Sequence, residues 1–125
     1  MKYIISESKL NDFILKYIEE IFPVDDINYT EGYDDDGNPD DSSYIFYFGD
    51  YDSDVDDGTI FRWYSKDYWE GDSVAARLRA EESPILSFDD WDNYHHLDSM
   101  FNEHWKPVFK QWFYDNFGLE IKTIV

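Results

Sequence analysis

The chain combines a very high aromatic content with a large negative charge, and any fold it adopts must accommodate both. It contains 5 Trp, 11 Tyr and 10 Phe residues and carries a formal net charge of −19 over 125 residues. Each buried ring removes roughly 150–250 Å² from water, so burying even half of the rings stabilises a compact fold against charge repulsion. Because disordered chains combine high charge with few aromatics, this composition predicts a folded domain with an aromatic core and an anionic surface.

The length of the chain indicates one domain spanning residues 1–125. Only 10 basic residues accompany 29 acidic ones, which argues against direct binding to DNA, RNA or an anionic membrane. The absence of cysteine excludes disulfides, iron–sulfur clusters and thiolate zinc sites, and it fits a reducing compartment. No apolar run approaches the roughly 18 residues of a membrane span, and residues 1–5 are too short for a signal peptide, so we expect a cytoplasmic protein.

Apolar residues at helical spacing predict an N-terminal helix. They are Leu10, Phe13, Ile14, Tyr17, Ile18, Ile21 and Phe22. This i, i+3, i+4 recurrence gives a single buried face. Ser6 or Ser8 is a candidate N-cap, and Pro23 prevents much continuation beyond the last apolar residue.

Two further helical regions are predicted in the second half of the chain. Residues 74–82 favour a helix that begins after Asp72-Ser73 and ends at Ser83-Pro84. From Asp90 onward an apolar stripe advances by three or four residues: Tyr94, Leu97, Phe101, Trp105, Val108 and Trp112. Since the stripe continues across Pro107, it predicts either one kinked helix or two helices that meet near Lys106. Gly118 is a good C-terminal stop.

Residues 43–48 and 59–64 are rich in β-forming side chains and predict paired strands joined by a long loop over 50–58. Residues 28–33 are expected to form a preceding strand, with residues 34–41 as its turn. Residues 119–125 predict a final strand, and residues 1–5 a short strand that leads into the first helix. The chain is therefore expected to adopt an α+β fold: an N-terminal helix, an antiparallel sheet of about four strands with acidic loops, aromatic-rich C-terminal helices and a final strand.

Residues 17–61 contain 15 carboxylates and no Lys or Arg. Asp50, Asp52, Asp54 and Asp56 alternate along this stretch, which in an extended chain places them on one face about 6.6 Å apart. Because each DNA strand carries a phosphate every ~3.4 Å, such a ladder joined to the second acidic cluster at residues 34–41 offers a basic groove negative charge at comparable density. We therefore predict a non-enzymatic inhibitor that acts by nucleic-acid mimicry, with a basic nucleic-acid-binding protein as its partner. The predicted partner-binding residues are Glu31, Asp34, Asp35, Asp36, Asp40, Asp41, Asp50, Tyr51, Asp52, Asp54, Asp56 and Asp57.

Other interpretations of the acidic clusters remain open. The carboxylates could be an ordinary solvated surface, although solubility needs a net charge of only about 2–8. The repeated aspartates also resemble the opening of a calcium-binding EF-hand loop. Counted from Asp50, however, Val55 stands where that loop needs Gly and Phe61 where it needs Glu, so only a weak divalent-cation site is left as an alternative.

No motif indicates an enzyme or a cofactor. The chain has no cysteine nucleophile, no Gly-x-Ser-x-Gly elbow and no glycine-rich phosphate loop. On one helix, His96 and His104 would lie about 12 Å apart along the axis, too far for one metal ion. We therefore expect structural or surface roles for these histidines and for His95.

The aromatic series of the last predicted helix supplies the main alternative function. Trp105, Phe109, Trp112, Phe113 and Phe117 are expected to be mostly core, but they spread over more than one helix face. Exposed rings among them would favour a structural or assembly protein that oligomerises through this surface, a homodimer included.

Two segments carry a resemblance to a class of proteins. The opening MKYIISE (residues 1–7) and the run from WFY (112–114) to FGLEIK (117–122) resemble small acidic proteins encoded by phages. Such proteins are similar in character to inhibitors of host defence, including anti-CRISPR and anti-restriction DNA mimics. The resemblance implies a decoy function and no catalytic residue.

Overall fold

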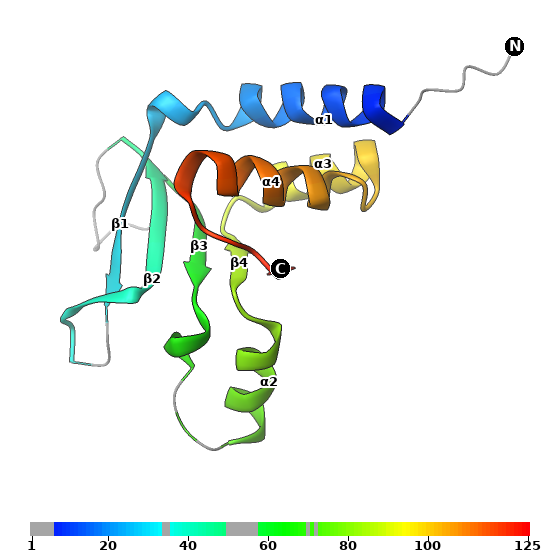
Figure 1. Ribbon diagram of the computed structural model, residues 1–125. Coiled ribbons are helices and arrows are strands. Elements are labelled where there is room, and N and C mark those ends of the chain that lie inside the picture. The colour runs from blue at the N-terminus through cyan, green and yellow to red at the C-terminus, as the bar shows by residue number, and fades with distance from the viewer. Residues whose placement is uncertain (1–6, 34–35, 50–57, 70, 72) are drawn as a thin grey trace, which may run out of the picture.

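The computed structural model describes residues 7–33, 36–49, 58–69, 71 and 73–125. It has an α+β fold in which the N-terminal helix and the two C-terminal helices pack against a five-stranded sheet, while the helix of residues 74–82 lies beyond one end of the strands (Figure 1). The α-helices are α1 (Glu7–Ile21), α2 (Val74–Glu82), α3 (Trp91–Phe101) and α4 (Trp105–Phe117). The strands are β1 (Ile27–Tyr33), β2 (Pro39–Phe48), β3 (Thr59–Tyr64), β4 (Ile85–Phe88) and β5 (Thr123–Ile124), and two 3-10 turns are η1 (Val24–Asp26) and η2 (Lys66–Tyr68).

The strands follow the order β1-β2-β3-β4-β5 in the sheet. The first three form the predicted antiparallel meander, and β4 pairs antiparallel with β3. These four strands are the expected antiparallel sheet, and the final strand β5 adds to it in parallel with β4, so the complete sheet is mixed. The reason is the connection: α3 and α4 intervene between β4 and β5, and such a crossover returns the chain in the same direction.

Strand β4 was not predicted. Its four residues are too few to show a period, yet they lie between β3 and β5, and Ile85, Leu86 and Phe88 are fully buried. β2 also begins earlier than expected, because Pro39 and Asp40 pair with Tyr33 and Gly32 instead of belonging to the turn. The final strand is shorter than residues 119–125, and residues 1–5 lie outside the described part of the chain.

The helices agree closely with the apolar patterns. α1 and α2 occupy the predicted positions, and the side chain of Ser73 caps α2 by accepting from the Ala76 amide. Ser8 lies inside α1, so it is not the N-cap, and Ser6 is outside the described residues. The C-terminal stripe forms two helices that separate at residues 102–104, earlier than Lys106. Pro107 lies in the first turn of α4, where its missing N–H has no helical partner to lose.

The core is built mainly from aromatic rings between the sheet and α1 and α4. Phe61 of β3 is fully buried at its centre. Its ring centroid lies 5.2–5.8 Å from those of Phe22, Phe46, Phe88, Phe109 and Phe113. This packing fixes the position of β1 and β2 relative to the helices.

The bulge in β1 leaves no space for a side chain at Gly32. A Cβ added there would lie 2.0 Å from Oγ and 3.2 Å from Cβ of Ser43, which is itself buried. We predict that Gly32→Ala destabilises the domain by about 1–3 kcal/mol, as overpacking usually does. Adding Ser43→Ala removes the closest clash and should restore part of that stability in urea unfolding. Equal stability of Gly32→Ala and the parent protein would contradict this packing.

Candidate functional site

The stretch without Lys or Arg builds neighbouring elements of the fold. Its described part builds most of α1's second half, then η1, β1 and β2, and β1 is the edge strand of the sheet (Figure 1). The described carboxylates on η1, β1 and the β1–β2 hairpin are Asp25, Asp26, Glu31, Asp36, Asp40 and Asp41. We call this set the acidic edge. The described basic residues lie instead in α1, β3, η2, α2, α4 and the C-terminal segment.

Strand β1 sets the spacing of the acidic edge. Asp25 and Asp26 precede the strand, Glu31 lies within it, and Asp36, Asp40 and Asp41 follow at the hairpin end. An extended strand of this length separates its two ends by roughly 20 Å. The carboxylates therefore form two groups at opposite ends of β1, with Glu31 between them.

The residues that flank the acidic loop 50–57 lie beside the start of β1. Phe48 pairs with Ile27, and the Phe48 amide donates to the Gly58 carbonyl oxygen at 3.0 Å, so the loop leaves and returns beside the start of β1. The hairpin that contains residues 34–35 attaches at the other end of the strand. The two acidic loops are thus joined to opposite ends of the β1–β2 hairpin and not to a common end.

The structure describes only part of the predicted site. Glu31, Asp36, Asp40 and Asp41 lie on the acidic edge, with Glu31, Asp36 and Asp41 exposed and Asp40 half-buried. Outside the described residues lie Asp34, Asp35, Asp50, Tyr51, Asp52, Asp54, Asp56 and Asp57. The alternating ladder over residues 50–56 therefore stays a prediction.

Hydrogen bonding keeps one carboxylate of the acidic edge ionised. The Ser42 amide donates to Asp40 Oδ1 at 3.0 Å. This backbone hydrogen bond lowers the pKa of Asp40. A carboxylate with a lowered pKa retains its negative charge to more acidic pH.

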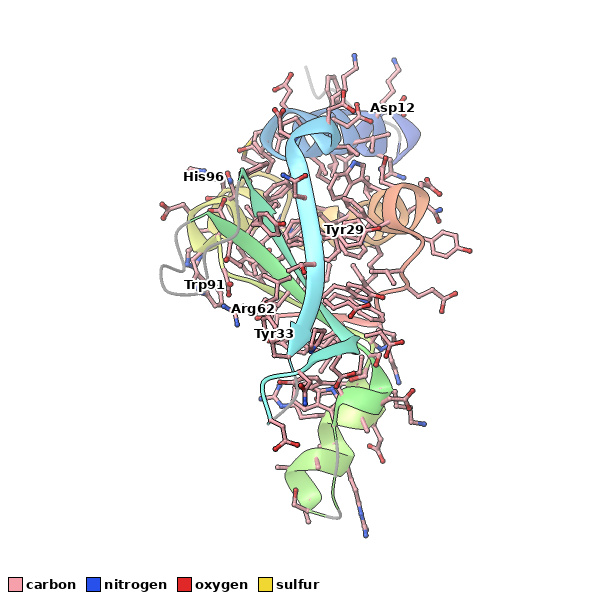
Figure 2. All side chains as sticks on the ribbon, turned by 90° about the vertical axis from the view of Figure 1, so that its left-hand side faces the viewer. Asp12, Tyr29, Tyr33, Arg62, Trp91 and His96 are labelled. Atoms are coloured by element: carbon pink, nitrogen blue, oxygen red, sulfur yellow. The ribbon has the colours of Figure 1, made fainter. Side chains whose placement is uncertain are left out.

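Tyrosines lie between the two carboxylate groups. Tyr29 and Tyr33 are 54% and 46% exposed, and Figure 2, in which β1 faces the viewer, shows both on this strand. The Tyr29 ring stacks on Phe46 at 5.4 Å between centroids and meets Phe117 edge-on at 6.0 Å. Tyr29 is thus held in place with much of its surface open. Strand alternation did not indicate this, because it places Tyr29 on the same face as buried Ile27; only the edge position leaves it uncovered.

The pKa of the Tyr44 phenol depends on the negative charges of the acidic edge. Burial raises the pKa of Tyr44 most, and the charges of Glu31 and Asp41 raise it further. We predict that Glu31→Gln/Asp41→Asn lowers the pKa of Tyr44 toward its ordinary value, measured by NMR of the phenolic ring carbon. Because the folded pKa is raised, the stability from protonated Tyr44 is complete below pH ~10 and is lost above it. An unchanged Tyr44 pKa in this variant would contradict the electrostatic contribution.

The structure also bears on the candidate metal ligands, on the histidines and on membrane-spanning helices. Among the described residues, no group of three His, Asp or Glu side chains is placed to hold a metal ion. His95, His96 and His104 are exposed on α3 and the turn that follows it. Within the same residues, none of the helices is sufficiently long and apolar to traverse a membrane.

Comparisons with models of protein families, with curated protein sequences and with solved structures found no match.

Proposed function

We propose that this protein is a non-enzymatic inhibitor that inserts its acidic edge into the basic groove of a nucleic-acid-processing protein, a nuclease or a CRISPR effector. One observation carries the proposal: a stretch of 45 residues without Lys or Arg builds η1, β1 and β2, with carboxylates at both ends of β1. On this proposal the loops of residues 34–35 and 50–57 extend the same surface.

The chemistry of the acidic edge suits a groove that normally holds a polynucleotide. The roughly 20 Å between the ends of β1 corresponds to about six phosphates of one DNA strand. Arg and Lys side chains that grip phosphates also grip carboxylates, and Arg does so in a bidentate manner. Tyr29 and Tyr33 offer ring surfaces where a nucleic acid offers bases, and Arg stacks readily on such rings.

The resemblance to phage-encoded anti-defence proteins agrees with this proposal and suggests action in the cytoplasm of a bacterial host. The alternative of an assembly protein relied on exposed rings along α4. Of the five rings, Trp105, Phe109, Trp112 and Phe113 are at most 3% exposed and belong to the core, whereas Phe117 is half-buried.

Salt dependence separates charge-driven binding from apolar assembly. We predict that the immobilised protein captures a basic protein from host lysate and releases it between about 50 and 500 mM salt, because screening weakens contacts between exposed charges. An apolar complex should persist over this range. Capture that survives the higher salt concentration unchanged would refute an electrostatic inhibitor.

A further inference from the structure

A groove between α1 and α4 has no role in the function proposed above. The described residues that line it do not belong to the acidic edge. The two helices run side by side in the same direction (Figure 1). An open cavity of about 480 Å³ lies between them. This volume lies within the usual range of ligand sites, roughly 300–1,000 Å³. We call this cavity the α1–α4 groove.

The groove has an apolar floor and an acidic rim. Leu15, Val108 and Trp112 form the floor, and Trp112 is only 3% exposed. Asp12, Glu19 and Asp115 lie on the rim with exposed side chains, and Figure 2 shows Asp12 on α1 at the outside of the molecule. Among the described residues that line the groove there is no Lys, Arg or His.

Two amide groups of the rim, those of Gln111 and Asn116, add acceptor oxygens to its carboxylates. Gln111 Nε2 donates to Asp115 Oδ1 at 2.8 Å, and Asn116 Nδ2 donates to the Trp112 carbonyl oxygen at 2.8 Å. Each of these amides therefore uses one of its two N–H donors within the protein, and its oxygen remains an acceptor beside the carboxylates. A cation with several hydrogen-bond donors suits the carboxylates and amide oxygens of this rim.

The spacing of the carboxylates selects among such cations. Asp12 and Glu19 are seven residues apart on α1, which is about 10.5 Å along the helix axis. Among the described residues, no three carboxylates lie close enough together to hold a metal ion. An extended organic cation therefore fits better than a compact ion: its apolar stem can cover Leu15, Val108 and Trp112 while its charged ends reach the rim.

We propose that the α1–α4 groove binds arginine side chains of a basic protein partner, seated as stems on the apolar floor with their guanidinium groups at Glu19, Asp115 and Asp12. A second copy of this chain is disfavoured because it carries the same charge of −19. This inference concerns a surface separate from the acidic edge, and it stands whether or not the acidic edge mimics nucleic acid.

The test is titration of the full chain with the peptide acetyl-Leu-Arg-Ala-Arg-Leu-amide, whose two arginines lie on the same side of the extended chain, about 6.6 Å apart. Calorimetry gives the affinity, and amide NMR shifts identify the residues contacted. We expect shifts in α1 and α4, and an affinity about tenfold lower for Glu19→Gln/Asp115→Asn. The matched control Glu81→Gln/Asp92→Asn removes two exposed carboxylates elsewhere and should bind as the parent does.

Three results would overturn the proposal. They are equal weakening in both variants, equal binding of a peptide with citrulline in place of arginine, and binding of spermidine at the groove without binding of the peptide. The variant Asp25→Asn/Asp26→Asn/Glu31→Gln/Asp41→Asn should leave peptide binding unchanged, so failure of the groove and failure of the acidic edge are measured separately.

Discussion

Replacing four carboxylates of the acidic edge by amides is expected to lower affinity for the basic partner on the order of 100-fold, the sum of several weakened charge pairs. The variant is Asp25→Asn/Asp26→Asn/Glu31→Gln/Asp41→Asn. All four side chains are exposed, so the fold should survive and urea unfolding should show stability equal to or above that of the parent. Affinity is measured by calorimetry with the captured partner at fixed salt.

A control with the same net charge separates position from total charge. Glu81→Gln/Glu82→Gln/Asp92→Asn/Glu103→Gln also removes four exposed carboxylates, on α2, on α3 and just after α3. This control should bind the partner within about threefold of the parent, since distant surface charges affect mainly the association rate. Equal loss of affinity in the two variants would mean that overall charge, and not the acidic edge, attracts the partner.

The second large effect concerns the aromatic core that holds the acidic edge in place. Phe61→Ala is expected to cost about 3–5 kcal/mol of unfolding free energy, because it leaves a cavity among five neighbouring rings. The melting temperature should fall by more than about 10 °C, measured by circular dichroism. Trp91→Ala, at a side chain that is 54% exposed, is the control and should cost less than about 1 kcal/mol. A loss below 1 kcal/mol for Phe61→Ala would contradict the described core.

Local sequence patterns predicted most of the helices and strands. They did not predict the features of the sheet that depend on contacts between distant parts of the chain. The apolar period predicted α1, and the β-rich composition of residues 59–64 predicted β3 with its observed bounds. β4 was not predicted because a four-residue strand shows no period in the sequence. It forms through its pairing with β3 and β5. The parallel direction of β5 was not predicted for a similar reason, since it depends on the crossover through α3 and α4 and not on the residues of β5 itself.

The candidate site was predictable in charge but not in arrangement. Counting Lys and Arg identified the acidic stretch, and the structure places the described part of that stretch along β1 and its hairpin. Sequence spacing could not show that the two acidic loops attach to opposite ends of β1, nor that Tyr29 is exposed. Both depend on β1 being the edge strand, which is a property of the whole sheet.

The most direct test of nucleic-acid mimicry is competition for the groove of the captured partner. Labelled duplex DNA is bound to that partner, and fluorescence polarisation follows its release as this protein is added. We predict complete displacement, with the concentration needed rising in proportion to the DNA present and with the variant neutralised at Asp25, Asp26, Glu31 and Asp41 far less effective. A ternary complex that retains the DNA, or equal displacement by that variant, would contradict the account.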